Sequence, residues 1–249
     1  MLAPPGDECP PPLTIIEGSS LFLDLDGTLL ELQDRPDRVI ADDPTRELLR
    51  RLAERLPGRF AVVSGRSIAQ IDAILGPVAR HIAVSGSHGL EQRFQGFVEH
   101  PVRPPAMDAV VERFRAFAQT HEGVLAEDKS FGAALHFRMA PEHGLAARRL
   151  AIQVAAASDL VLQDGKMMIE VRLPGGDKGG AIRKLMTQAP MSGTRPVFAG
   201  DDVTDEDGFR VVQAMGGLAI MVGELRPTKA DFFLANPAAL RAWLGGLVA

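Results

Sequence analysis

The chain has 249 residues, which is long enough for one large domain or for a core with a smaller inserted domain. It carries 27 lysines and arginines against 32 aspartates and glutamates, a net charge of -5 without a long basic run, which argues against nucleic acid as a partner. Its single cysteine excludes an internal disulfide and a zinc site built from cysteines.

The first thirteen residues are rich in proline and lack the basic and apolar regions of a signal peptide. We expect a loose leader here, with a partner-binding extended segment as the alternative. No later stretch approaches 18 consecutive apolar residues, so the sequence predicts neither a membrane segment nor export. The expected location is the reducing cytoplasm. We expect a monomer, although the sequence does not determine the oligomeric state.

Two parts of the chain alternate short apolar runs with amphipathic helical patterns, which is typical of a parallel sheet covered by helices. The predicted strands lie at 21–25, 60–64, 82–86, 196–200 and 219–223. The predicted helices lie at about 44–56, about 67–75, from Lys178 onward, and at about 204–214. We therefore predict an α/β fold with a Rossmann-like core domain made of residues 1–102 and 175–249.

The pattern between these parts is different, and it gives the order helix, strand, strand, helix, strand, strand. These elements are predicted at about 105–120, 124–127, 133–138, 141–157, 160–163 and 167–172. The short turns at 128–132 and 163–166 favour antiparallel hairpins over crossovers. We predict an inserted α+β cap of the form αββαββ over residues 103–174. The proline cluster at 101–105 and the glycine-rich stretch at 174–180 are its expected hinges.

Acidic residues follow the first predicted strand, in the string Asp-Leu-Asp-Gly-Thr at 24–28. Strand alternation places Asp24 and Asp26 on one side, at the sheet edge where open α/β folds bind ligands. An isolated pair of this kind often only caps a turn. An EF-hand is excluded because Leu29 and Arg35 occupy the positions of its glycine and its terminal glutamate. The full string arises by chance in roughly a few chains per thousand of this size.

Three further polar groups follow strands or begin helices. Ser64, Gly65 and Arg66 offer a hydroxyl and backbone amides that can hold a phosphate oxygen, although a plain helix cap is the alternative. Lys178 lies among glycines, where its ammonium can balance charge on a reacting phosphate unless it is simply solvated. The carboxylates within 201–206 repel one another without a cation. Such hard oxygen ligands suit magnesium, although one or two of them can cap the next helix instead.

Taken in order, these clusters resemble the four motifs of the haloacid dehalogenase superfamily of phosphotransferases. Over about residues 20 to 245, the chain is similar to one family within it, the trehalose-6-phosphate phosphatases. The matching strings are DLDGTL from Asp24, SGR (64–66), GSHGLE (86–91), ALHFR (134–138) and GDDVTDE (200–206). In the cap, Glu127 and Lys129 match the pattern E-x-K, and Glu170 matches a third sugar-contacting position of the family.

The resemblance implies hydrolysis of trehalose 6-phosphate to trehalose and phosphate, with Mg²⁺ as cofactor, in trehalose biosynthesis. It implies that Asp24 is the nucleophile, that Asp26 is the proton donor and later the base, and that Ser64 and Lys178 hold phosphate oxygens. The implied metal ligands are the carboxylates of Asp24 and Asp201 and the backbone carbonyl of Asp26, while Asp205 orients Lys178 or a metal-bound water. The implied substrate-binding residues are Thr28, Gly65, Arg66, His88, Glu127, Lys129, Arg138 and Glu170.

Other functions stay open at this point. A related phosphatase with the same core and a different cap specificity acts on sucrose phosphate or mannosylphosphoglycerate. A non-catalytic sugar-phosphate sensor uses the fold without turnover, and a phosphomutase returns the phosphoryl group to the sugar. The complete set of Asp24, Asp26, Lys178 and Asp201 favours an enzyme, because a sensor needs neither a nucleophile nor a proton shuttle.

Overall fold

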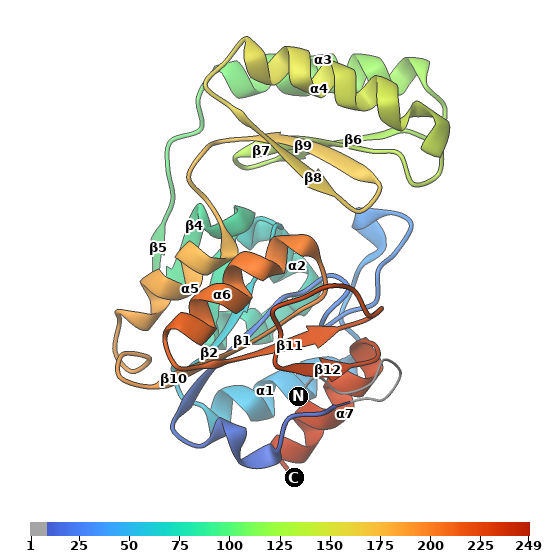
Figure 1. The fold of residues 1–249 in the computed structure, drawn as a ribbon. Coiled ribbons are helices and arrows are strands. Elements are labelled where there is room, and N and C mark those ends of the chain that lie inside the picture. Colours follow the sequence, from blue (N-terminus) through green and yellow to red (C-terminus); the bar gives the residue numbers. More distant parts are fainter. Residues whose placement is uncertain (1–8) are drawn as a thin grey trace. The chain divides into compact units, whose positions relative to one another are not determined.

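The computed structural model of the chain describes residues 9–249, which form two compact units (Figure 1). The first unit contains residues 9–99 and 177–249, and the second contains residues 100–176. Residues 1–8, which carry most of the predicted leader, lie outside the described residues. Among residues 9–249, no helix is both long and apolar enough to cross a membrane.

The first unit is built on an eight-stranded sheet in the order β12-β11-β10-β1-β2-β3-β4-β5. Its strands are β1 (Ser19–Leu23), β2 (Phe60–Val63), β3 (Ala83–Gly86), β4 (Glu91–Phe94), β5 (Phe97–Glu99), β10 (Arg195–Gly200), β11 (Leu218–Val222) and β12 (Phe232–Leu234). All neighbours pair in parallel except β4, which is antiparallel to β3 and β5. The predicted parallel α/β core is therefore confirmed, and the β4–β5 hairpin and β12 are additions that the sequence pattern did not reveal.

Helices cover both faces of this sheet, as Figure 1 shows, because alternate residues of each strand point to opposite sides. Leu21 and Leu23 of β1 pack in one apolar core with α1, α2 and α7, whereas Phe22 packs in a second core with α5 and α6. These helices are α1 (Asp43–Arg55), α2 (Ile68–Leu75), α5 (Lys178–Met186), α6 (Glu206–Ala214) and α7 (Pro237–Leu247). Every residue of β1 is buried, which is typical of a strand covered on both faces.

The strand order places a switch point between β1 and β10. From β1 the chain continues to β2 and β3 on one side, and after the second unit it returns to β10 and β11 on the other side. Open α/β sheets bind ligands beyond the carboxyl ends of the strands at such a point. The residues that follow β1 and β10 are therefore the first place to look for a site.

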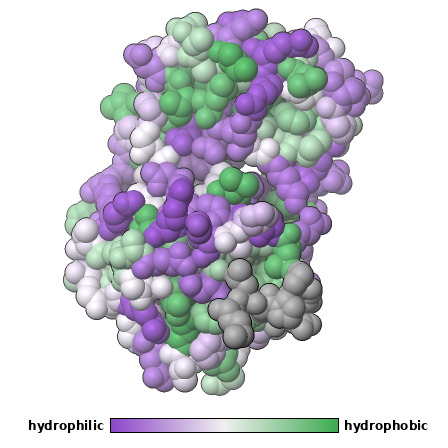
Figure 2. Space-filling model, in the orientation of Figure 1, coloured by the Kyte–Doolittle hydropathy of each residue, from purple (hydrophilic) through white to green (hydrophobic). Residues whose placement is uncertain are grey.

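The second unit contains α3 (Ala106–Thr120), β6 (Leu125–Lys129), β7 (Gly132–His136), α4 (Gly144–Ala156), β8 (Val161–Gly165) and β9 (Met168–Arg172). This is the predicted order αββαββ, and the sheet β6-β7-β9-β8 is antiparallel throughout. Residues such as Phe114, Leu135 and Ile169 form its core beneath the helices. Figure 2 shows apolar residues scattered among hydrophilic ones over these helices, as is normal for a protein surface.

Short 3-10 helices complete the two units. They lie at Leu13–Ile16, Pro36–Arg38, Gly76–His81, Ser87–Gly89, Pro141–His143 and Val203–Asp205. The last of these directly precedes α6, so the helix predicted from about residue 204 begins as a tighter turn.

The start of the described chain is docked onto the core rather than loose. Cys9 exchanges two backbone hydrogen bonds with Phe233 of β12, at 3.1 and 3.0 Å. The indole nitrogen of the buried Trp243 donates to the carbonyl of Pro11 at 2.8 Å. The expectation of a loose leader is therefore wrong for residues 9–12. The segment covers the edge of β12, which would otherwise offer unpaired backbone groups.

Candidate active site

A buried lysine joins two aspartates beyond the carboxyl ends of β1 and β10. Lys178, the first residue of α5, donates through Nζ to Asp24 Oδ1 at 2.7 Å and to Asp205 Oδ1 at 2.6 Å. All three side chains are buried. Burial opposes the charge of Lys178, but Asp205 and Asp24 outweigh this effect and raise its pKa. The alternative in which Lys178 is simply solvated is therefore wrong.

The turn after β1 separates the two aspartates of the first motif. β1 ends at Leu23, so Asp24 and Asp26 do not share one strand face as strand alternation predicted. Asp24 is buried, whereas the side chain of Asp26 is 25% exposed. Gly27 turns the chain with a φ of +87°, and a Cβ atom there would lie 2.2 Å from Asp201 Oδ2. A glycine is therefore needed both for the turn and for the approach of Asp201.

Asp201 completes a group of three carboxylates. Asp24, Asp201 and Asp205 each offer an oxygen, and these atoms lie within 4.8 Å of one another. Thr28 donates a hydrogen bond from Oγ1 to Asp201 Oδ1 at 3.2 Å. Burial and the charge of Asp205 raise the pKa of Asp201 to about 7. Burial also raises the pKa of Asp24 well above its usual value, although Lys178 opposes the change.

This carboxylate group is suited to a divalent cation. Its donors are all hard oxygen atoms, which Mg²⁺ prefers over nitrogen or sulfur. Burial is the main cause of the raised pKa values of Asp24 and Asp201, and repulsion from Asp205 adds to it. Three carboxylates share the single ammonium of Lys178. A bound divalent cation would supply the missing positive charge, so the residues present fit Mg²⁺.

The turn after β10 is held by two of its own carboxylates. Asp205 Oδ2 accepts hydrogen bonds from the backbone amides of Asp201 and Asp202, at 3.0 and 2.9 Å. The carboxylate of Asp202 accepts from the amide of Val203 at 2.6 Å. The expectation that one or two of these acidic residues cap the following helical turn is thus met by Asp202 and Asp205. Asp205 also contacts Lys178 through its other oxygen, so it links the turn to the lysine.

The loop between β2 and α2 brings an arginine to the second aspartate. The hydroxyl of Ser67 accepts from the amide of Gln70 and caps α2, so the plain cap is not Ser64. The Ser64 hydroxyl is buried and accepts from the amide of Arg66 at 3.1 Å. Arg66 donates to both carboxylate oxygens of Asp26, at 2.6 and 2.7 Å. Arg66 therefore contacts the Ser64 hydroxyl through its backbone amide and the Asp26 carboxylate through its side chain.

A strained turn supports this loop from the next strand. Ser87 and His88 have φ values of 49° and 56°, which are uncommon for residues other than glycine. The His88 ring lies against Gly65, where a Cβ atom would approach Nε2 to 2.6 Å. The buried Glu91 accepts from the Ser87 hydroxyl at 2.5 Å and from the Ile68 amide at 3.3 Å. Glu91 was not among the predicted site residues. The feature of the sequence that could have indicated it is its position at the end of the string GSHGLE.

In the second unit, the predicted sugar-contacting residues lie on one face of the sheet. Glu127 and Glu170 both pair with Ala134 in the strand register, so they share the face opposite the helices. Lys129 Nζ lies 2.5 Å from Glu170 Oε2. His136 Nε2 lies 2.7 Å from Glu127 Oε2. The four side chains thus form two pairs, Lys129 with Glu170 and His136 with Glu127, on this face of the sheet.

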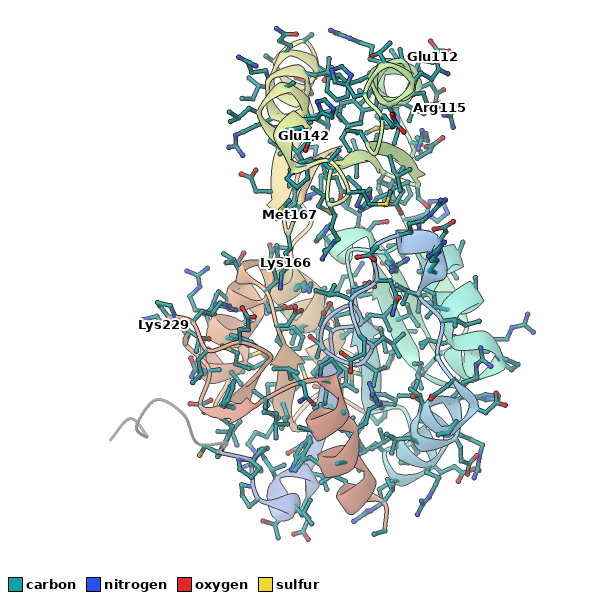
Figure 3. All side chains as sticks on the ribbon, turned by 90° about the vertical axis from the view of Figure 1, so that its right-hand side faces the viewer. Glu112, Arg115, Glu142, Lys166, Met167 and Lys229 are labelled. Carbon is teal, nitrogen blue, oxygen red and sulfur yellow. The ribbon has the colours of Figure 1, made fainter. Side chains whose placement is uncertain are left out.

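The observed side-chain contact of Arg138 involves none of the residues in these two pairs. It follows β7 and donates to the backbone carbonyl of Lys166 at 3.3 Å. Lys166 and Met167, both labelled in Figure 3, form the tip of the β8–β9 hairpin. His136, two residues earlier in the string ALHFR, is the residue of that string that contacts Glu127.

Comparison with known proteins identifies the family. A family model described as trehalose-phosphatase matches residues 22–238, which is most of the chain. The chain belongs to the trehalose-phosphatase family. It is 38% identical over 227 residues to the trehalose-6-phosphate phosphatase of Escherichia coli (strain K12), covering 90% of this chain and 84% of that protein. A probable trehalose-phosphate phosphatase of Sinorhizobium fredii (strain NBRC 101917 / NGR234) is 34% identical, with 94% and 89% covered.

Solved structures show the same architecture. The crystal structure of a trehalose-6-phosphate phosphatase related protein is 28% identical with a TM-score of 0.80, covering 92% of this chain and 97% of that one. A haloacid dehalogenase-like hydrolase from Bacteroides thetaiotaomicron is 15% identical with a TM-score of 0.63 and shares the fold, covering 92% and 98%. These findings confirm the predicted family, the haloacid dehalogenase-like fold and the enzyme class, a phosphatase for trehalose phosphate.

Proposed function

We propose that this trehalose-phosphatase family member hydrolyses trehalose 6-phosphate to trehalose and inorganic phosphate, with Asp24 as the nucleophile. The reaction is that of the family, and it is a step of trehalose biosynthesis. The observation that supports the role of Asp24 is its place at the end of β1, buried and bonded to Lys178. A nucleophilic carboxylate needs such an environment, because a fixed cation balances the charge of the incoming phosphate.

We propose Mg²⁺ as the cofactor of this site. Its protein ligands would be the carboxylates of Asp24 and Asp201 and the backbone carbonyl of Asp26. When bound, Mg²⁺ supplies positive charge that reduces the repulsion between the Asp24 carboxylate and the substrate phosphate. Asp205 would act beside the cation by holding Lys178 and the turn that carries Asp201.

In the first step, a carboxylate oxygen of Asp24 forms a bond to phosphorus as the bond from phosphorus to the sugar oxygen breaks. The electron pair of that bond stays on the sugar oxygen, which takes a proton from Asp26. Lys178, the Ser64 hydroxyl and the Gly65 amide stabilise the charge on the remaining phosphate oxygens. Because Arg66 binds both oxygens of Asp26, these two side chains must separate before the proton is transferred.

In the second step, water hydrolyses the aspartyl phosphate. Asp26 takes a proton from the water as its oxygen attacks phosphorus, and the bond from phosphorus to Asp24 breaks. Inorganic phosphate leaves and Asp24 regains its carboxylate. Asp26 then holds the proton that the next substrate needs, so the cycle is balanced.

We propose that the second unit is a cap that recognises the sugar. Glu127, Lys129 and Glu170 offer charged hydrogen-bonding groups on one sheet face, and a disaccharide presents many hydroxyls to such groups. Arg66, His88 and Arg138 are the further proposed substrate contacts, whereas Thr28 would act through its bond to Asp201. The reducing cytoplasm is the proposed location, which the single cysteine supports.

The test is phosphate release from a panel of sugar phosphates in the presence of Mg²⁺. The panel contains trehalose 6-phosphate, sucrose phosphate and mannosylphosphoglycerate, with the Asp24→Asn variant as the blank. We expect a kcat/KM for trehalose 6-phosphate that is about 100-fold or more above the others, since unpaired polar groups strongly penalise a wrong sugar. Equal rates across the panel would contradict the assignment of trehalose 6-phosphate as the preferred substrate. Binding without turnover would favour the sensor.

A further inference from the structure

An arginine outside every predicted motif donates hydrogen bonds to the turn that carries Asp201. Arg226 lies in the loop between β11 and β12, and its Nη2 donates to the backbone carbonyl of Asp202 at 2.7 Å. Its Nε donates to the carbonyl of Asp201 at 3.3 Å. The side chain is only 21% exposed, so these bonds are partly shielded from water.

Glu206 holds Arg226 in this position. Arg226 Nη1 forms an ion pair with Glu206, the first residue of α6. Glu206 also accepts from the Thr228 hydroxyl at 2.7 Å and from the Lys229 amide at 3.0 Å. Burial opposes the charge of Glu206, but these hydrogen bonds and the charge of Arg226 outweigh it and lower its pKa. The loop and the turn are thus joined by a network of charge-assisted hydrogen bonds.

The peptide units at Asp201 and Asp202 are consequently held from two sides. Their amides donate to Asp205, and their carbonyls accept from Arg226. With the backbone fixed in this way, the Asp201 side chain has little freedom, and its carboxylate lies in the group formed with Asp24. An exposed residue of the same loop, Lys229, is labelled in Figure 3 and makes no such side-chain contact among those observed in residues 9–249.

We propose that Arg226 is a positioning residue that sets the orientation of Asp201 and thereby the affinity of the site for its divalent cation. The inference rests on the proposed function, since it concerns the Mg²⁺ ligand assigned there. Partners that orient a metal ligand commonly change metal affinity by about 10- to 100-fold when they are mutated. Arg226 does not contact the substrate in this assignment, so sugar recognition should be affected little.

A role through charge alone and a positioning role predict opposite changes in Mg²⁺ affinity when Arg226 is removed. The direction of that change therefore tests the proposal. If the arginine acted only through its charge, its removal would reduce repulsion and strengthen Mg²⁺ binding. If it positions Asp201, removal weakens binding. Arg226→Lys separates the two effects further, because lysine keeps the charge but cannot reproduce the forked contact with two carbonyls.

The experiment measures Mg²⁺ binding to the metal-free full-length protein by calorimetry and by the Mg²⁺-dependent rise in melting temperature. For Arg226→Gln and Arg226→Lys we expect about tenfold weaker Mg²⁺ binding. The KM for trehalose 6-phosphate at saturating Mg²⁺ should stay within about threefold of the wild type. Adding Glu206→Gln to Arg226→Gln should weaken binding little further, since the two residues act as a unit.

Arg210→Gln is the matched control, because Arg210 is an exposed arginine of α6 that pairs with Asp207. It should bind Mg²⁺ as the wild type does. Unchanged or tighter binding in Arg226→Gln, or wild-type binding in a folded Arg226→Lys protein, would overturn the positioning role alone. Absence of Mg²⁺ binding by the wild-type protein would instead overturn the proposed cofactor, and the inference with it.

Discussion

Lys178 and Asp24 are joined by a buried hydrogen bond of 2.7 Å, although 154 residues separate them in the chain. The contact exists because β1 and the start of α5 meet at the same edge of the sheet, beyond the strand ends. A fixed ammonium beside the proposed nucleophile costs no reorganisation when the phosphate arrives. The two residues thus depend on the fold for their chemistry, and each can be tested separately.

Replacing Asp24, the proposed nucleophile, should abolish turnover without unfolding the protein. We expect Asp24→Asn to lower kcat for trehalose 6-phosphate by about 10³-fold or more, since an amide cannot form the covalent intermediate. Acid-quenched wild-type enzyme should carry a phosphoryl group that the variant lacks. Asp34→Asn, at an exposed residue of the following loop, is the control and should retain full activity. Full turnover in Asp24→Asn would overturn the covalent mechanism.

Removing the lysine should destabilise the protein in a pH-dependent way. Lys178→Met leaves Asp24 and Asp205 buried without their cation, and we expect the free energy of unfolding to fall by about 3 kcal/mol at neutral pH. The loss should be smaller at about pH 5, because burial raises the pKa of Asp24 and its carboxylate is then more easily protonated. Urea denaturation at both pH values measures this difference.

The control for that variant is Lys184→Met, which removes an exposed lysine of the same helix that pairs with Glu99. An exposed ion pair contributes about 1 kcal/mol or less, so its unfolding free energy should change little. Equal destabilisation of Lys178→Met at both pH values would contradict the idea that the variant leaves the buried Asp24 carboxylate without its counter-ion.

Local patterns predicted the parallel core and the αββαββ order of the second unit, because these depend on residues close together in the chain. The apolar run at 196–200 and the helical period from Lys178 are visible without knowledge of their partners. The strings around Asp24 and Asp201 predicted which residues gather at the sheet edge, because parallel strands end at that edge.

Contacts between distant segments could not be predicted in this way. Arg66 and Asp26 are 40 residues apart, and Arg226 and Asp202 are 24 apart, so no local period links them. The short β12 was likewise hidden, since its three residues form a strand only through pairing with β11 and Cys9. Long-range pairing decides such cases, because β propensity mostly reflects the surroundings of a strand.

The metal-free protein should become less stable as the pH rises towards 7. The pKa of Asp201 is about 7 in the folded state against 3.8 ordinarily, so the folded state binds more protons between these values. The free energy of unfolding therefore falls as the pH rises through this window. Mg²⁺ competes with that proton, so its affinity should weaken by up to about tenfold for each pH unit below 7.

Thermal melts at about pH 6 and about pH 8, with and without Mg²⁺, measure this linkage. The Mg²⁺-dependent rise in melting temperature should be larger at the higher pH. Asp201→Asn is the informative variant, because it removes both the titrating group and a proposed cation ligand and should show a small rise at either pH. The same rise at both pH values in the wild type would contradict the linkage.

Sugar recognition by the second unit should be separable from the chemistry. Glu170→Gln removes the charge that pairs with Lys129, and we expect kcat/KM for trehalose 6-phosphate to fall by about 10- to 100-fold. Hydrolysis of p-nitrophenyl phosphate, which has no sugar hydroxyls, should change by less than about threefold. Asp164→Asn, at an exposed residue of β8 that pairs with Arg148 of α4, is the control. Parallel losses on both substrates would mean that Glu170 serves the core reaction or the fold instead.

Removing residues 1–12 should loosen the edge of the core sheet at β12. The deletion removes the hydrogen bonds from Cys9 to Phe233 and from Trp243 to Pro11, and we expect the free energy of unfolding to fall by about 2 kcal/mol. Trp243 is the single tryptophan, so its fluorescence emission should shift to longer wavelength as water reaches the ring. Removing residues 1–8 alone keeps both contacts, so the emission and stability of this shorter deletion are the reference for the longer one. Unchanged emission in the longer deletion would show that the docked segment does not shield Trp243.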